Sequence, residues 1–359
     1  MSTPSRIRRT VAKWAVGFVA VVALLYVLKV IAPSGSVPEQ ILEAILDVGY
    51  ASSILRVSVP IAFAAFGGIF AERSGIINIG IEGFLILSAL SSIVAVQRFL
   101  FMGMETTTAL WLAFFVGILV SVAAAAVFAV FTIRYQSNQV IAGLAVWLIS
   151  LGLAPFVSLI LFESVNSPSV ETFGTWTIPV LSEIPAVGPV FFDASPMVYL
   201  MLITAPLAWY VLRSTRLGRR IRAAGENPRA LDTAGVSVSK VRYIGVLLSG
   251  VLCGIGGAGF TLGQLGVFVG NLDTSIGGRG FLGIVAYLFG NYNPIASLGG
   301  AALFASFDSL QFRLQQISAL DVPSQLFGIL PYVVVLVTLT LIGRTRIPAA
   351  LGEHYDDEE

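Results

Sequence analysis

Predominantly apolar stretches of about 18 residues or more recur from one end of this chain to the other. Each is long enough to cross the hydrocarbon core of a bilayer as a helix, which takes about 20 residues. Charged residues make up only 11% of the 359 residues, whereas they make up about a quarter of an average soluble protein. We therefore expect an all-α, polytopic membrane protein with about ten membrane helices, within a range of eight to ten.

One of the ten apolar segments is short. Residues 281–290 cannot make a full straight span, so this segment is either a compressed span or a re-entrant half-helix. The ten segments are 14–31, 52–70, 76–96, 109–133, 139–162, 195–212, 243–263, 281–290, 295–310 and 325–342.

The basic residues fall mostly on one side of this layout. With the N-terminus inside the cell, the cytoplasmic side receives 16 of the 21 Lys and Arg residues, and the outer side receives only Arg98, Arg279 and Arg313. Because cytoplasmic loops carry the excess of basic residues, this bias predicts that both termini and the basic segment, residues 213–242, are cytoplasmic. The acidic segment 163–194, which has no Lys or Arg, is then outside.

The sequence predicts one membrane domain over residues 14–342, between a basic N-terminus (1–13) and a tail (343–359). A secretory signal peptide would also begin with basic residues and an apolar run. The run 14–31 is long for that purpose, and no clear cleavage site follows it. A retained first span is therefore favoured.

The basic segment holds eight basic residues and the signals of a short helix. Asn227 is a preferred N-cap, Pro228 suits the first helical position, and Gly235 suits the residue after the last turn. We expect a capped helix of about seven residues between two membrane spans, placed where another protein can bind it.

Several polar residues lie in or beside the apolar segments, where charges are costly and usually face the bundle interior. Glu82 follows Asn78 by four residues and is expected on the same helical face. These two residues either border the substrate path, or Glu82 pairs with Arg56 or Arg73 to hold the bundle together. Asp308 and Gln311, one turn apart, have the same two interpretations. Arg279, between glycines, is expected to anchor the chain at the membrane interface or to line an outer gate.

Other chemistry is disfavoured by what the sequence lacks. One cysteine, Cys253, and one histidine, His354, cannot form an internal disulfide or a zinc site. None of the three lysines lies in a phosphate-binding Gly-x-x-x-x-Gly-Lys frame, so we expect no ATPase site on this chain and no enzymatic activity of its own.

A weak internal similarity relates two parts of the chain. The glycine-rich text around segments 52–70 and 76–96 resembles that around 243–263 and 281–290. These pairs are five spans apart, so a repeat of this kind must be inverted, as in many transporters. We expect a 5+5 inverted repeat with short or broken helices.

Four blocks in order resemble the permease subunits of ABC importers for nucleosides and simple sugars, within the branched-chain amino acid and ribose permease superfamily. The closest branch is the second of the two permeases in nucleoside systems. The acidic end of the tail departs from this pattern. The blocks are Ala-Glu-Arg-Ser-Gly-Ile-Ile-Asn-Ile-Gly-Ile-Glu-Gly83, Ala-Gly-Glu-Asn-Pro-Arg-Ala-Leu-Asp-Thr-Ala-Gly235, Gly-Gly-Arg-Gly-Phe281 with Phe-Gly-Asn-Tyr-Asn-Pro294, and Pro-Ala-Ala-Leu-Gly352.

The resemblance implies several partners in the cell membrane. They are a second, different permease, a cytoplasmic ABC ATPase that uses the ATP, and an extracytoplasmic substrate-binding lipoprotein, in addition to the lipid bilayer. It implies no cofactor or metal bound by this chain and no nucleic-acid partner. By resemblance, the ATPase-coupling helix is formed by Gly225, Glu226, Asn227, Pro228, Arg229, Asp232 and Gly235.

The function that follows is a membrane path for a nucleoside or related simple sugar, driven by a separate ATPase. The alternative is an ion- or proton-coupled secondary transporter of small polar solutes. Such a transporter is expected to have more intramembrane acidic residues and no need for a capped cytoplasmic helix.

Overall fold

The computed structural model describes residues 28–29, 31–33, 35–185, 187–271, 275–317 and 345–355, with a few isolated positions between 329 and 340. The expected spans 14–31 and 325–342 lie almost wholly outside these residues, as do the basic N-terminus and the acidic end of the tail.

The described chain is mostly helical, and its strands form one hairpin of two-residue strands in which Trp176 pairs with Ala194. This confirms the all-α expectation. The elements are α2 (Val37–Leu46), α3 (Val48–Arg73), α4 (Ile81–Phe101), α5 (Thr106–Ala129), η1 (Val130–Arg134), α6 (Gln139–Phe162), β1 (Trp176–Thr177), η2 (Leu181–Glu183), α7 (Gly188–Phe191), β2 (Asp193–Ala194), α8 (Pro196–Ser214), α9 (Arg216–Glu226), α10 (Pro228–Thr233), α11 (Val238–Phe260), η3 (Thr261–Leu265), α12 (Arg279–Phe289) and α13 (Pro294–Leu314).

Six helices of the described chain are long and apolar enough to cross a membrane: α3, α4, α5 with η1, α6, α8, and α11 with η3. The expected span 139–162 coincides with α6. The expected span 76–96 is wrong at its start, because residues 76–80 are not helical and α4 begins at Ile81.

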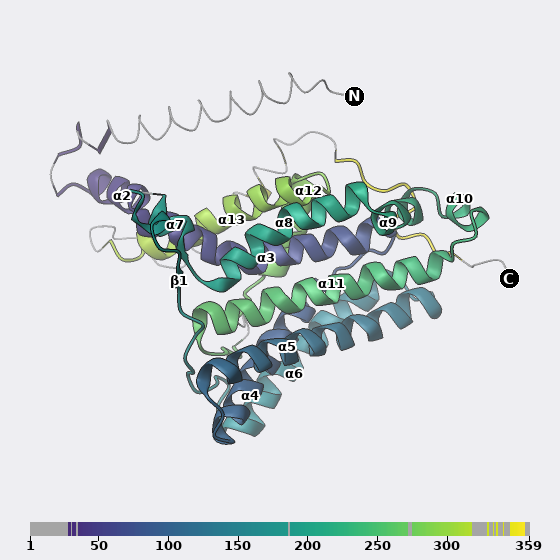
Figure 1. Ribbon diagram of the computed structural model, residues 1–359, viewed down its shortest axis with the longest axis horizontal. Coiled ribbons are helices and arrows are strands. Elements are labelled where there is room, and N and C mark those ends of the chain that lie inside the picture. The colour runs from purple at the N-terminus through teal and green to yellow at the C-terminus, as the bar shows by residue number, and fades with distance from the viewer. Residues whose placement is uncertain are drawn as a thin grey trace.

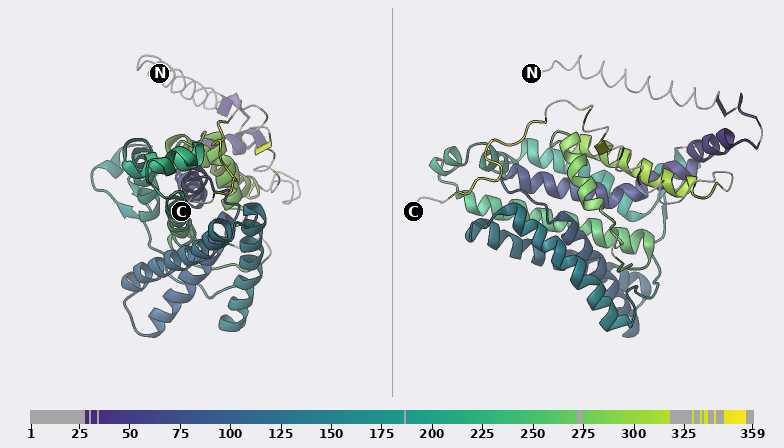
Figure 2. Two further views of the ribbon diagram at one scale, coloured as in Figure 1. Left: turned by 90° about the vertical axis from the view of Figure 1, so that its right-hand side faces the viewer. Right: turned by 180° about the vertical axis from the view of Figure 1, so that it is seen from behind.

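Helix α11 lies near the centre of the bundle, between two groups of helices (Figures 1 and 2). It packs against α3 on one side and against α4 and α5 on the other, and α12 and α13 pack on α3. The contacts of α11 with α3 run in opposite chain directions, since Gly245 lies against Ser74 and Gly256 against Phe63. An inverted repeat requires this antiparallel pairing, but part of the 5+5 arrangement lies outside the described residues and stays a prediction.

Small residues allow this close packing at the centre. A Cβ atom on Gly67 of α3 would lie 2.9 Å from the Cys253 sulfur of α11, so only glycine fits there. Phe63 and Phe66, next to it on α3, are fully buried. Helices in lipid associate through packing of this kind, because lipid tails are as apolar as the side chains.

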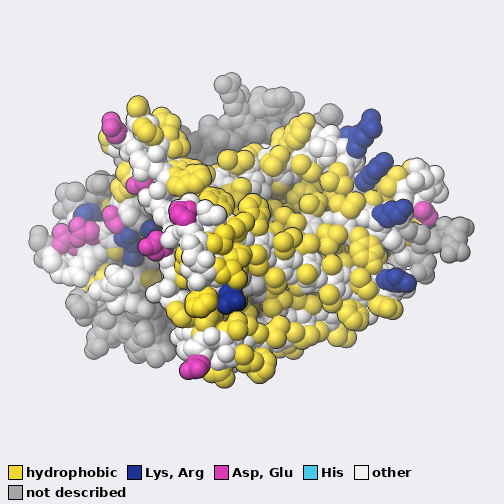
Figure 3. Space-filling model, turned by 60° about the horizontal axis from the view of Figure 1, so that its bottom comes forward, with side chains coloured by type: hydrophobic (Ala, Val, Ile, Leu, Met, Phe, Trp, Pro, Cys, Tyr) yellow, Lys and Arg dark blue, Asp and Glu magenta, His cyan; other side chains and the backbone are white. Residues whose placement is uncertain are grey.

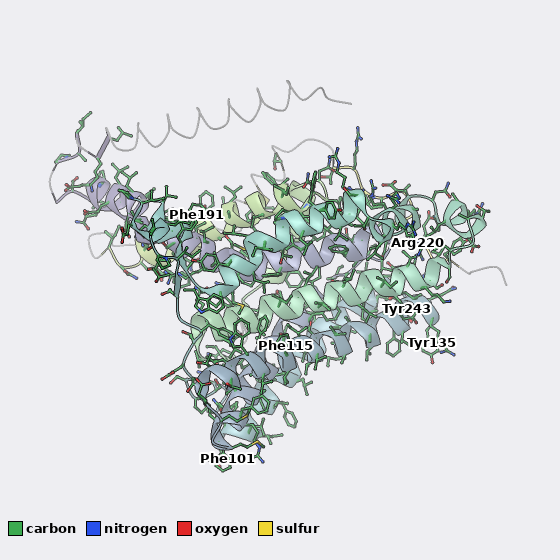
Figure 4. All side chains as sticks on the ribbon, in the orientation of Figure 1. Phe101, Phe115, Tyr135, Phe191, Arg220 and Tyr243 are labelled. Atoms are coloured by element: carbon green, nitrogen blue, oxygen red, sulfur yellow. The ribbon has the colours of Figure 1, made fainter. Side chains whose placement is uncertain are left out.

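The surface divides into an apolar band and two polar ends. In Figure 3 apolar side chains cover the middle of the visible face, with basic residues gathered at one end. We call the end with α9 and α10 the basic end, and the end with α2, α7 and the hairpin the acidic end. Figure 4 places Arg220 and Tyr243 at the basic end and Phe191 at the other. The exposed apolar side chains of α5 and α6, such as Phe115 and Ile160, belong to the band.

The short segment 281–290 is part of α12, an 11-residue helix of about 16 Å, half the thickness of a bilayer core. The chain before it lies at the acidic end, where Ser167 and Val170 donate backbone hydrogen bonds to the carbonyl oxygens of Phe268 and Gly266. Helix α13 then leaves the basic end and reaches the acidic end, where Arg313 contacts Asp47. Between residues 266 and 289 the chain therefore passes from the acidic end to the basic end. Among the described residues of this stretch, helix is present in the second half, as α12.

Candidate functional site

Helices α4 and α12 both begin inside the bundle, and their first residues meet there. Glu82, in the first turn of α4, is only 2% exposed. Its Oε1 accepts a hydrogen bond from the Gly278 backbone N–H at 2.9 Å, and its Oε2 accepts one from the Gly280 N–H at 2.6 Å. The unpaired N–H groups of a helix N-terminus and the helix dipole both favour a carboxylate at this place. Glu82 therefore caps α12 from another helix.

An ion pair lies beside this cap. The Arg279 Nη2 and the Asp308 Oδ2 of α13 are 2.7 Å apart, and each side chain is only 13% exposed. The Arg279 guanidinium also lies 4.8 Å from the centre of the Phe260 ring. Arg279 is thus held within the bundle, and its expected role as an interface anchor is wrong. We call the site formed by Asn78, Glu82, Gly278, Arg279, Gly280 and Asp308 the interior crossing.

Two expectations about this site are corrected. Asn78 does not share a helical face with Glu82, because it lies in the irregular stretch before α4. Its Nδ2 donates to the Ser249 hydroxyl of α11 at 3.0 Å, while its buried Oδ1 has no protein partner within the described residues. Glu82 bonds to backbone N–H groups instead of Arg56 or Arg73. A sequence does not show which distant backbone a side chain will reach.

Asp308 and Gln311 lie on the same helix, α13, but in different surroundings. Asp308 is buried against Arg279, whereas Gln311 is one turn nearer the acidic end and only half-buried. Of this pair, the structure brings only Asp308 to the interior crossing.

A second buried polar cluster connects the core to the basic end. The Glu72 carboxylate of α3 accepts hydrogen bonds from the hydroxyls of Tyr287 and Tyr292, at 2.6 and 2.7 Å. The Arg73 guanidinium lies 5.2 Å from the centre of the Tyr292 ring. Burial, and then the Glu72 carboxylate, raise the pKa of Tyr292, so its hydroxyl remains a donor. Our sequence interpretation missed Glu72, Tyr287 and Tyr292, although a carboxylate next to Arg73 at the end of a span was the available signal.

Arg73 connects this cluster to the basic segment. Its Nη1 lies 3.6 Å from the Glu226 Oε1, at the last residue of α9. Helix α9, which the sequence interpretation did not predict, packs against α8, α3 and α11. It buries Ile221 and Ala224 and leaves arginines on its outer face. The basic segment is thus two helices that meet at Asn227.

Helix α10 has the expected caps. The Asn227 Oδ1 accepts a hydrogen bond from the Ala230 N–H at 3.1 Å, and Pro228 occupies the first turn. Gly235 has a φ of +74°, the left-handed conformation that favours glycine after a helix. Arg229 is exposed on α10, Asp232 is half-buried, and only Leu231 of this helix is buried.

The C-terminal segment, residues 345–355, lies across the same region. The backbone N–H groups of Ala350 and Gly352 donate to the carbonyl oxygens of Gly225 and Gly75, at 2.8 and 3.0 Å. The Tyr355 hydroxyl donates to the Asp232 carboxylate at 2.9 Å. The Arg242 Nη1 donates to the Glu353 carbonyl oxygen at 2.8 Å. The C-terminal segment therefore forms hydrogen bonds with the turn after α3, with the α9–α10 region and with α11.

A family model supplies the identification. The model described as the branched-chain amino acid transport system / permease component matches residues 50–339. The chain belongs to this family. The match includes the interior crossing and the whole basic segment, so both are parts of the permease component rather than additions to it.

Three relatives in the permease family match over nearly their whole length. The nucleoside ABC transporter permease protein NupC of Lactococcus lactis is 36% identical, covering 85% of this chain and 95% of its own. The guanosine ABC transporter permease protein NupQ of Bacillus subtilis is 34% identical, covering 83% and 93%. The putative glucose ABC transporter permease protein TsgC13 of Haloferax volcanii is 32% identical, covering 86% and 98%. A second L. lactis nucleoside permease protein, NupB, matches over 98 residues at 34% identity, 26% of each chain.

Proposed function

We propose that this permease is the membrane-spanning subunit of an ABC importer that carries nucleosides. Two of its relatives are named for nucleosides or guanosine, and a third for glucose, which keeps a simple sugar as the other candidate substrate. Its partners are a second permease chain, a cytoplasmic ABC ATPase that consumes the ATP, and an extracytoplasmic binding lipoprotein. NupB, a second nucleoside permease in the organism that has NupC, supports a different chain as the second permease.

The observation that carries this proposal is the construction of the basic end. Helix α10 is short, capped at both ends and partly exposed, and its Asp232 is bonded to Tyr355. Gly225 and Glu226, at the end of α9 just before it, are bonded to Ala350 and Arg73. Because the α9–α10 junction is held by these bonds, a force applied to α10 moves the helices behind it instead of bending α10 alone. We infer that α10 docks on the ATPase, and that the positive-inside bias places this end in the cytoplasm.

The path of the push follows the contacts of α9. This helix packs against α8, α3 and α11. Its Glu226 also contacts Arg73, which lies beside the Glu72 cluster, and Tyr287 of that cluster belongs to the C-terminal half of α12. Movement of α10 then tilts α8, α11 and α3 together. It also changes the orientation of α12, whose first turn lies at the interior crossing. Two packed arrangements of these helices provide the outward-facing and inward-facing states that alternating access needs.

The interior crossing fits the place of a broken helix in a transporter. Discontinuous helices that begin near the bilayer midplane commonly border the substrate path. In this chain Glu82 occupies the α12 N-terminus and Arg279 is neutralised by Asp308. At the crossing the Arg279 cation is ion-paired and both oxygens of the Glu82 carboxylate already accept hydrogen bonds, so neither group is free to bind an ion, which suits a neutral solute such as a nucleoside or sugar.

Reconstitution tests the proposal. The chain is co-expressed with a candidate ATPase, second permease and binding protein from the same genome, purified, and placed in vesicles that contain ATP. We expect ATP-dependent uptake of labelled guanosine or uridine that exceeds uptake of labelled glucose or ribose at least tenfold. Uptake of sugars alone would correct the substrate. Uptake by the chain alone, driven by a proton or sodium gradient, would support the secondary transporter and refute the proposal.

A further inference from the structure

A pocket of about 530 Å³ opens at the basic end, between the turn that joins α8 to α9 and the loop that joins α12 to α13. Three arginines from three elements line it: Arg73 of α3, Arg213 of α8 and Arg222 of α9. Trp209 and Asn293 also line the pocket, and no acidic residue is part of the lining.

Positive charge in this pocket is not balanced by the described part of the chain. The described residues form four ion pairs, and only one of them includes a lining arginine, Arg73 with Glu226 at 3.6 Å. Glu226 is half-exposed, so it screens Arg73 weakly. Arg213 and Arg222 have no carboxylate within 4.0 Å among these residues. A concave site with a surplus of like charges favours an anion.

The arginines are also held in place. The Arg213 guanidinium lies 5.2 Å from the centre of the Trp209 ring, and the Arg222 Nε donates to the Gly218 carbonyl oxygen at 3.4 Å. Arg73 is fixed by its contact with Tyr292. Groups that are ordered before a ligand arrives lose less conformational entropy on binding it.

The chemistry of the site indicates which anion it accepts. Guanidinium groups bind both carboxylates and phosphates through two parallel N–H donors. A phosphate group has more oxygens than a carboxylate and can carry more negative charge, so it can accept hydrogen bonds from more of the three arginines at once. The N-terminus of α13, a helix of 21 residues, begins in the lining at Pro294 and adds its positive dipole end. The volume lies within the range of small-ligand sites, about 300–1,000 Å³.

We propose that this arginine pocket binds a phosphate-bearing anion. Two sources share this chemistry. Trp209 and Arg213 lie in the last turns of the α8 span, which is the level of lipid headgroups. The other source is a soluble phosphate ester such as a nucleotide. Because Arg73 also pairs with Glu226, an anion in the pocket competes for the guanidinium that joins α3 to α9, and so adjusts how firmly α9 is held.

The test uses the full chain in nanodiscs and needs neither substrate nor ATPase, so it stands apart from the test of the proposed function. In one arm, nanodiscs of phosphatidylcholine are titrated with guanosine monophosphate and with inorganic phosphate. In the other, phosphatidylglycerol and cardiolipin are added to the nanodiscs. Bound anions are detected by native mass spectrometry. The pocket variant is Arg213→Gln with Arg222→Gln, and the matched control is Arg219→Gln with Arg220→Gln, two exposed arginines of α9 outside the pocket.

We expect the pocket variant to bind the anion at least about tenfold more weakly, equivalent to about 1.4 kcal/mol, and the control to bind as the parent chain does. Binding in the first arm identifies a soluble source, and binding only in the second identifies a lipid. A single Arg213→Lys variant, which keeps the charge without the planar donors, should fall in between. Equal loss in pocket and control variants, or no saturable binding in either arm, overturns the proposal.

Discussion

The interior crossing and the basic end both use glutamate and arginine side chains, but these are buried at the crossing and partly exposed at the basic end. At the crossing, Glu82 is 2% exposed and bonds at 2.6 and 2.9 Å, and Arg279 pairs with Asp308 at 2.7 Å. At the basic end, Glu226 is half-exposed and 3.6 Å from Arg73. Buried charge is tolerated only when it is closely paired, because desolvation is costly. Exposed charge needs no partner from its own chain.

The difference assigns distinct tasks to the two regions. Close pairing at the crossing fixes where α4 and α12 begin, and with it the whole arrangement of broken helices. Looser bonds at the basic end leave basic side chains available to other molecules while a few contacts hold the base of α10. A change at the crossing should therefore affect folding, whereas a change at the basic end should affect coupling.

The largest effect is expected from Glu82→Ala. It leaves the buried N–H groups of Gly278 and Gly280 without an acceptor, which costs about 2 to 5 kcal/mol. We expect a much lower thermal midpoint and poor recovery of purified chain from detergent. Glu82→Gln keeps one acceptor oxygen and should be milder. The control is Glu171→Ala, at an exposed carboxylate. If the two variants lower the thermal midpoint equally, the crossing does not determine the fold.

The next largest effect is expected at the caps of α10. Asn227→Ala with Gly235→Ala removes the N-cap acceptor and strains the left-handed residue, at about 1 kcal/mol each. Because α10 buries little, the thermal midpoint of the chain should hardly change. In reconstituted vesicles, uptake should fall at least tenfold while the ATPase still hydrolyses ATP. Lys240→Gln, on α11 nearby, is the control. Normal uptake by the cap variant would show that α10 is not the coupling helix.

A smaller effect is expected from the Arg73–Glu226 pair. Arg73→Gln, Glu226→Gln and the double variant form a cycle whose coupling free energy should be about 0.5 kcal/mol, because the pair is long and partly exposed. The thermal midpoint of unfolding measures it. Uptake per ATP hydrolysed should fall about twofold in either single variant. Additive effects in the cycle would mean that Arg73 acts through Tyr292 alone.

The smallest effect concerns pH at the acidic end. A hydrogen bond from Arg313 lowers the pKa of Asp47 below its usual value. A carboxylate with a lowered folded-state pKa contributes stability above its unfolded pKa, about 3.9, and loses it as the pH falls through the folded value. Since Asp47 is half-exposed, we expect under about 1 kcal/mol. Melting curves from pH 7 to pH 3 should show a slightly steeper loss for the parent chain than for Asp47→Asn. Parallel curves would count against the pair.

Much of this outline was predictable because it depends on local patterns. The span 139–162 matches α6, since an uninterrupted apolar run flanked by Asn138 and a polar loop has only one helical solution. The α10 helix followed from Asn227, Pro228 and Gly235, whose preferences act within one turn. The start of α4 was misplaced because residues 76–80 are apolar enough to be helical. They are kept out of the helix by contacts that are distant in sequence, such as Asn78 with Ser249.

The partners of the polar residues could not be predicted in the same way. Our interpretation offered Arg56 or Arg73 for Glu82, because opposite charges attract and both were near in sequence. The actual donors are two backbone N–H groups nearly 200 residues away. The Glu72 cluster was missed because tyrosines more than 210 residues from a carboxylate carry no local signal.

The sequence by itself determined that this chain is a helical membrane protein, which end of it is basic, and that α10 is a capped helix. These depend on hydropathy, charge counts and cap preferences, which are short-range properties of the chain. Only the tertiary structure decided that α4 and α12 begin at one buried point, that Glu82 caps α12, and that three arginines form one pocket. Those results depend on which distant backbones approach each other, and in lipid close packing of small residues such as Gly67 and Gly256 makes that choice.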